Sequence, residues 1–115
     1  MAKYVVLIPA DESAWEATPQ EEKDRVYTAH AEFAKLLAER GHTFVEGAEL
    51  VPSGRAKIVS GSLDDVSVTD GPYAEAAEQL SGFYRVSIDD EAALLEAAEV
   101  LVRAHPAVEI RPIES

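Results

Sequence analysis

Residues Phe83–Ile88 read FYRVSI, and their side chains alternate between the two faces of an extended strand. Tyr84, Val86 and Ile88 share one wholly apolar face. The acidic run Asp89-Asp90-Glu91 follows at once and suits the first turn of a helix, where the helix dipole favours negative charge. The stretch therefore predicts a strand followed directly by a helix that can cover its apolar face.

The remainder of this helix and the end of the chain extend the pattern. The spacing predicts a buried stripe on this helix, made of Leu94, Ala98, Leu101 and Val102. His105-Pro106 predicts the end of the helix, because proline cannot continue it. Residues Val108–Ile113 read VEIRPI and predict a last strand, with Val108 and Ile110 on one face.

A strand and a long helix are also predicted at the start of the chain. Lys3–Pro9 (KYVVLIP) is a short β-branched run that proline stops, as in a buried strand. Thr18-Pro19-Gln20-Glu21 matches a capping box, with Thr18 as the N-cap and Glu21 reaching back from N3. The helix stripe that follows consists of Val26, His30, Phe33 and Leu37. Arg40-Gly41 predicts the end of this helix.

The middle of the chain alternates between short strands and turns. Three strands are predicted: Thr43–Val51, Ala56–Ser60 and Val66–Thr69. Pro52-Ser53-Gly54 predicts a hairpin-type break between the first two, and Gly61–Asp65 a second turn. Tyr73–Leu80 (YAEAAEQL) has the alanine and glutamate content of a short helix.

This order of elements predicts an α+β fold, a single ferredoxin-like βαββαβ domain over residues 1–115 with an extra hairpin and short helix. If both long helices cover one face of the sheet, parity places Phe83, Arg85, Ser87, Glu109 and Arg111 on the other. Such a half-apolar face invites association. We therefore expect a two-fold homodimer with its sheets packed face to face and a wet cleft between them that admits a small molecule.

Composition narrows the functional classes. The chain has 115 residues, 47% of them hydrophobic, with a net charge of −12 and no cysteine. The negative charge repels phosphate backbones and anionic lipid, so neither nucleic acid nor a membrane is an expected partner. No apolar run approaches the roughly 20 residues that span a bilayer, and no secretory leader is recognised, so the expected location is cytoplasmic. No disulfide can form.

No cofactor or metal site is predicted either. The sequence lacks a P-loop, a dinucleotide-binding glycine pattern and a G-x-S-x-G nucleophile motif. Its three histidines, His30, His42 and His105, lack the i, i+4 spacing of a helical metal-binding pair.

The segment Thr69-Asp70-Gly71-Pro72-Tyr73-Ala74-Glu75, continued by Glu78–Tyr84, resembles the signature of the YCII-related family, in particular its DGPF branch. In that branch the fourth letter is usually Phe, and here it is Tyr73. The similarity extends to the opening KYVVLI and the ending VEIRPI. The resemblance implies the dimeric α/β-barrel form of the ferredoxin-like fold.

The resemblance also implies two alternative functions. Family members look like dehydrochlorinases, with a helix-borne histidine and a nearby aspartate as an acid/base pair; His30 matches that histidine, and Glu46 or Glu49 would replace the aspartate. Members of the DGPF branch are often encoded beside extracytoplasmic-function sigma factors, which implies a non-catalytic regulatory or sensing role. The first alternative predicts a lyase or isomerase-like proton transfer.

The candidate catalytic residues are His30, Glu49 and Asp70. An imidazole titrates near neutrality, and a neighbouring carboxylate can fix its tautomer. Glu49 or Asp70 would supply that carboxylate. Each has an alternative structural explanation, because His30 lies on an apolar stripe and Asp70-Gly71-Pro72 suits a turn in which proline starts the short helix.

The candidate ligand-binding residues are Tyr73, Arg85 and Arg111. Tyr73 would lie beside the backbone N–H groups of the helix start, and the two guanidinium groups could each hold a carboxylate. In so acidic a chain, ion pairs with Glu or Asp are the alternative for both arginines. Trp15 and Tyr4, near the first strand, could wall an aromatic pocket or simply pack in the core.

Overall fold

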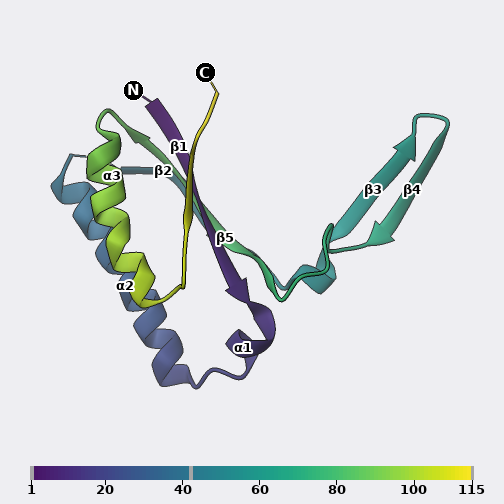
Figure 1. The fold of residues 1–115 in the computed structure, drawn as a ribbon, viewed down its shortest axis with the longest axis horizontal. Coiled ribbons are helices and arrows are strands. Elements are labelled where there is room, and N and C mark those ends of the chain that lie inside the picture. The colour runs from purple at the N-terminus through teal and green to yellow at the C-terminus, as the bar shows by residue number, and fades with distance from the viewer. Residues whose placement is uncertain (1, 42, 115) are drawn as a thin grey trace.

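Four antiparallel strands form the central sheet of the computed structural model, in the order β2-β5-β1-β6 (Figure 1). The strands are β1 (Ala2–Asp11), β2 (Thr43–Glu49), β5 (Glu78–Ile88) and β6 (Glu109–Pro112). The structure describes residues 2–41 and 43–114, without the side chains of 43–45. With helices α2 (Gln20–Glu39) and α3 (Glu91–Ala98), this order confirms the ferredoxin-like α+β fold.

Both helices cover the same face of the sheet, and the core lies between the two layers (Figure 1). The largest fully buried side chains come from helices and strands alike: Phe33, Leu37, Ile88, Leu94, Leu101, Val6 and Val86. Tyr84 and Ile110 pack against this core, so the predicted parity of β5 and β6 is confirmed. Within the described ranges, no helix is both long enough and apolar enough to cross a membrane.

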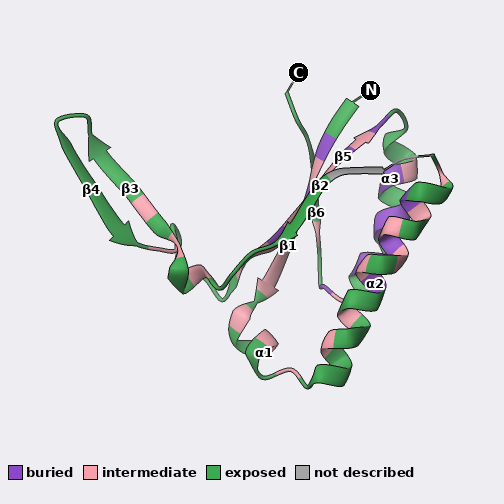
Figure 2. Cartoon of the chain, turned by 180° about the vertical axis from the view of Figure 1, so that it is seen from behind, coloured by how far each residue is buried: buried purple, intermediate pink, exposed green. Residues whose placement is uncertain are grey.

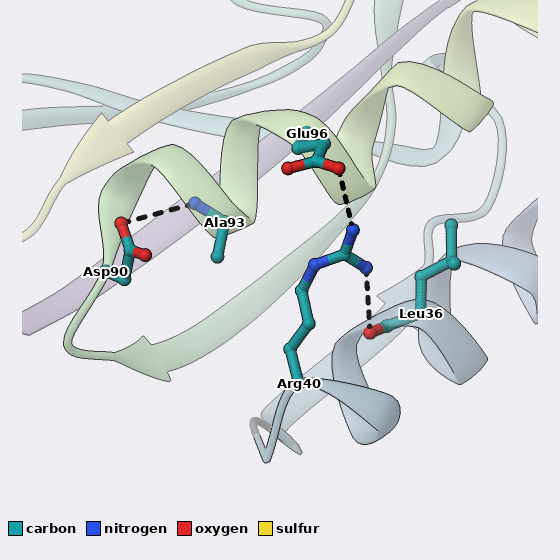
Figure 3. Close-up of polar contacts among 5 residues, drawn as sticks. All are labelled: Leu36, Arg40, Asp90, Ala93 and Glu96. Carbon is teal, nitrogen blue, oxygen red and sulfur yellow. Dashed lines mark hydrogen bonds and ion pairs between the residues drawn. The ribbon is translucent and has the colours of Figure 1, made fainter.

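Arg40 joins the end of α2 to α3 (Figure 3). Its guanidinium donates to the Leu36 carbonyl at 3.2 Å and to the Glu96 carboxylate at 3.0 Å. Asp90 caps α3 by accepting from the Ala93 N–H at 3.4 Å. The predicted single helix is in fact α3 followed by the 3₁₀ helix η2 (Glu99–Arg103), and the turn before His105-Pro106 is therefore tighter than expected.

The start of α2 differs from the predicted capping box. A short helix α1 (Glu12–Glu16) comes first, capped by the Asp11 carboxylate. The Thr18 hydroxyl donates to the Ala14 carbonyl at 2.6 Å, so it serves the end of α1. The N-cap of α2 is Pro19, with no side-chain cap. The predicted capping box is therefore wrong, because the Thr18 hydroxyl is bonded to α1 and not to the first N–H groups of α2.

The middle of the chain forms an arm that projects from the sheet (Figures 1 and 2). Strands β3 (Lys57–Ser62) and β4 (Asp65–Asp70) pair only with each other in the described structure, and every residue from 59 to 70 is exposed. The predicted hairpin around Pro52-Ser53-Gly54 is wrong, because β2 pairs with β5 and a 3₁₀ turn, η1 (Ser53–Arg55), leads into the arm.

The predicted short helix over Tyr73–Leu80 is also wrong. Strand β5 begins at Glu78, and Gln79 and Leu80 lie opposite Ala10 and Pro9 of β1. Pairing with β1 thus overrides the helix propensity of the local sequence.

Candidate functional site

A cavity of about 400 Å³ opens between α2 and the sheet. Helix α1 and the segment after β2 close its sides, and His105 approaches from beyond η2. Its lining is mainly apolar and aromatic, as in small-molecule sites. The polar side chains that reach it are Glu12, Glu16, Tyr27, His30, Glu49, Ser81, Tyr84 and His105.

Three of these groups form a continuous hydrogen-bonded chain. The Tyr84 hydroxyl lies 2.6 Å from Nδ1 of His30, and Nε2 of His30 lies 2.8 Å from Nε2 of His105. When both imidazoles are neutral, one Nε2 must donate and the other accept. The Tyr84 hydroxyl can then donate to Nδ1 while Nε2–H of His30 donates to His105, or the histidines can donate in the reverse sense. Either arrangement can pass a proton along the chain.

The fold fixes each member of this chain through packing. His30 lies on α2 four positions after Val26 and one turn before the fully buried Phe33. The Tyr84 ring packs against Phe33, with centroids 5.4 Å apart. It also covers Gly47 of β2, where an added Cβ would meet the ring at 2.5 Å. Glycine is therefore required at this point for the ring to lie against the sheet.

Burial controls the protonation of the site. Desolvation lowers the pKa of His30, with the negative charge of Glu49 acting in the opposite direction. Desolvation, and next the neighbouring His30, lower the pKa of His105 to about 4. Burial raises the pKa of Tyr84. At neutral pH the side chains of Tyr84, His30 and His105 are therefore all uncharged, and His30 can accept a proton.

Glu49 lies on β2 opposite Gly82 of β5, at the wall of the cavity. The Tyr27 hydroxyl donates to both of its carboxylate oxygens, at 3.2 and 3.3 Å. Burial and the negative charge of Glu49 raise the pKa of Tyr27. The carboxylate adds a negative potential that stabilises an imidazolium at His30.

A family model described as the YCII-related domain matches residues 2–115. The chain belongs to the YCII-related family. A relative from Rhizobium meliloti (strain 1021), named "Uncharacterized protein R00369", is 34% identical over 113 residues. The matched region covers 96% of this chain and 90% of the relative. The YCII-related domain thus accounts for nearly the whole chain.

The YCII-related domain brings together two of the three predicted catalytic residues. His30 and Glu49 both line the cavity. Asp70 does not; it ends β4 at the base of the arm, is exposed and pairs with Lys57. The cavity of His30 lies between α2 and the sheet of one chain, and not on the uncovered face of the sheet, where the cleft between two copies is expected. A helix side chain cannot reach the uncovered face of the sheet.

The predicted ligand-binding residues lie elsewhere in the YCII-related domain. Tyr73 is 91% exposed in the segment after the arm, without the expected helix start beside it. Arg85 and Arg111 lie on the uncovered face of the sheet, and each pairs with a carboxylate, Glu46 and Glu109 respectively. A role of these residues in ligand binding stays a prediction.

Sequence reasoning missed His105, Tyr84 and Tyr27 as members of the site. In the sequence His105 marks the end of a helix and is one of three histidines without the spacing of a metal-binding pair, and Tyr84 belongs to an apolar strand face. One available signal was the phenol hydroxyl of Tyr84, because a buried tyrosine needs a hydrogen-bond partner. Trp15, considered for an aromatic pocket, does line the cavity, whereas Tyr4 lies in the core.

The histidine pair has the geometry of a hydrogen bond. Its 2.8 Å nitrogen separation is typical of donor and acceptor atoms. Across residues 2–41 and 43–114, no group of three or more His, Cys, Asp or Glu side chains could hold a metal ion.

Proposed function

We propose that this YCII-related protein binds a small, largely apolar molecule in the His30 cavity and catalyses a proton transfer on it. The observation that carries the proposal is the Tyr84–His30–His105 chain in the wall of a cavity of about 400 Å³. A cavity of this volume has the size of a small-molecule site, and histidine is the side chain that most often acts as a general acid or base. A lyase or isomerase reaction, which begins with the removal of a proton, fits these groups.

His30 is the proposed general base. It is neutral at physiological pH because burial lowers its pKa, and it is positioned by Tyr84 and His105. Both ring nitrogens of His30 have protein partners, so the substrate proton reaches it through Tyr84. The Tyr84 oxygen takes the proton from the substrate as its own proton moves to Nδ1 of His30, and the Nε2 proton of His30 can move on to His105, while Glu49 stabilises the charge that forms on His30. The reverse transfer lets the Tyr84 hydroxyl return the proton to the product. Positioned groups of this kind accelerate proton transfer about 10²–10⁴-fold.

Hydrogen–deuterium exchange into a carbon acid tests this function without knowledge of the substrate. Acetophenone in D₂O, followed by proton NMR, would lose its methyl signal faster with the protein than with free imidazole at equal concentration. His30→Gln is expected to lower the protein-dependent exchange about 10²-fold or more, because glutamine cannot take up the proton. Circular dichroism would confirm that the variant folds.

Glu39→Gln provides the matched control, since Glu39 is exposed at the end of α2 and does not line the cavity. Its exchange rate should equal that of the unmodified protein. Exchange that survives His30→Gln would contradict the assignment of the base. Binding of acetophenone without exchange would instead favour the non-catalytic sensing role.

We also propose that the chain belongs to the DGPF branch of the family and forms a homodimer. Asp70-Gly71-Pro72-Tyr73 supports the branch. The dimer is supported by the uncovered face of the sheet, where Val5, Leu7 and Phe83 are only half-buried. The valines of the arm also support a dimer, because Val59, Val66 and Val68 are each more than half exposed and a second copy could cover them.

Sedimentation should give a mass twice the 12.4 kDa of one chain at micromolar concentration. Raising the salt should strengthen the association, because each copy carries a net charge of −12 and salt screens their repulsion. Leu7→Glu on the uncovered face should yield monomers. Leu95→Glu, at a helix residue that is 50% exposed, is the matched control and should leave the dimer intact. A single-chain mass at every salt concentration would exclude the dimer.

A further inference from the structure

We propose that the ligand of the His30 cavity is a cation, specifically an amine with an apolar or aromatic body, and that Glu49 recognises its ammonium group. This inference rests on the proposed binding function and adds the chemical class of the ligand. It follows from the sign of the charges around the cavity and from the hydrogen bonds that its carboxylates do and do not already accept.

The charged side chains that line the cavity all carry the same sign. Glu12, Glu16 and Glu49 reach it, and none of the lining residues that the structure describes is a lysine or an arginine. The two histidines add no positive charge at neutral pH, because burial lowers the pKa of both. A ligand carboxylate would therefore meet repulsion and, among the described lining residues, no guanidinium or ammonium partner. A ligand cation would be attracted, and the net charge of −12 adds a favourable field.

Glu12 and Glu49 differ in the hydrogen bonds that their carboxylate oxygens accept from the rest of the protein. Both oxygens of Glu12 accept short hydrogen bonds, at 2.8 Å each, from the N–H and the hydroxyl of Ser53. Glu12 thereby ties α1 to η1. Glu49 accepts from the Tyr27 hydroxyl at 3.2 and 3.3 Å, which is long for a bond between oxygens. A carboxylate offers about four acceptor sites. Glu49 therefore retains the capacity to bind an ammonium.

Aromatic rings beside Glu49 add to the preference for a cation. Trp15 and Tyr27 both line the cavity and pack edge to face, with centroids 5.9 Å apart. Lys23 already places its ammonium 5.0 Å from the Trp15 centroid, which is within the range of a cation–π contact of about 6 Å. The electron-rich faces of these rings favour cations and apolar ligand bodies over anions.

The fluorescence of Trp15 provides a direct readout, because it is the single tryptophan of the chain and lines the cavity. Three probes of nearly equal shape separate the charges at pH 7: benzylamine, benzyl alcohol and benzoate. We expect benzylamine to bind at least ten-fold more tightly than either of the others. Glu49→Gln should weaken the binding of benzylamine about ten-fold, because one charge-assisted hydrogen bond is lost, and should leave the affinity for benzyl alcohol unchanged.

Glu39→Gln removes the same charge away from the cavity and should leave all three affinities unchanged. Glutamine at position 49 keeps an oxygen that can accept the Tyr27 hydroxyl, and thermal melting would confirm that this variant folds. Equal binding of benzylamine and benzyl alcohol, or tighter binding of benzoate, would overturn the inference and leave the proposed binding function standing. No response to any of the three probes would overturn both.

Discussion

Between pH 7 and pH 4 the free energy of unfolding should fall by about 2–3 kcal/mol through His105. The pKa of His105 is about 4 in the folded protein, against 6.5 for an ordinary histidine. As the pH falls through 6.5, His105 therefore takes up a proton in the unfolded chain, whereas in the folded protein it does so only near pH 4. Unfolding is favoured progressively across that window, and the stability from a neutral His105 is complete only above it. Urea unfolding at several pH values measures the loss.

His105→Gln isolates this contribution. Glutamine does not titrate, and its side-chain oxygen can accept the Nε2–H of His30. The variant should lose less stability than the unmodified protein over the same pH range, by about 2 kcal/mol. His30→Gln should produce a smaller difference, because Glu49 partly offsets the effect of burial on the pKa of His30. Identical pH profiles for the unmodified protein and His105→Gln would contradict this prediction, because they would show that His105 has the same pKa in the folded and unfolded states.

Gly47→Ala should destabilise the protein by about 1–3 kcal/mol and break the contact between Tyr84 and His30. The new Cβ would meet Cδ1 of Tyr84 at 2.5 Å and Cε1 at 3.0 Å. Phe33 packs against the same ring, so the ring cannot move without losing contacts or its 2.6 Å bond to His30. Urea unfolding gives the change in stability, and ¹⁵N NMR of the imidazole reports the loss of the bond.

Gly54→Ala is the matched control. Gly54 lies in η1, and a Cβ added there would meet no atom within 4 Å. Its stability should change by less than about 0.5 kcal/mol in either direction. If both alanine variants behaved alike, the effect of Gly47→Ala could not be attributed to the Tyr84 ring.

The main layers of the fold were predictable because their signals are local. Alternation in β5 and the helical stripe containing Phe33 and Leu37 need only the sequence within one element. The errors came where distant pairing decides. The Tyr73–Leu80 segment has helical composition, yet its last three residues, Glu78–Leu80, extend because β1 offers a partner. Thr18 does not cap α2, because its hydroxyl donates to the Ala14 carbonyl of α1.

The same reasoning explains what was found of the site. His30 could be singled out by its chemistry, and Glu49 as a replacement carboxylate through the family resemblance. Tyr84 and His105 lie 54 and 75 positions from His30 along the chain. No periodicity or spacing connects residues so far apart. Only the packing of α2 against β5 and the turn after η2 brings them together.

The arm has a consequence for how this architecture tolerates change in length. Leu50 and Ser81 are hydrogen-bonded at 2.8 Å, so the β2–β5 ladder is already closed beneath the inserted segment. The residues of the arm, 57–70, leave and return side by side, because the Gly71 N–H donates to the Ala56 carbonyl at 2.7 Å. Insertions, deletions or a grafted peptide there would leave the strand order of the core untouched, so loop engineering can begin at this junction.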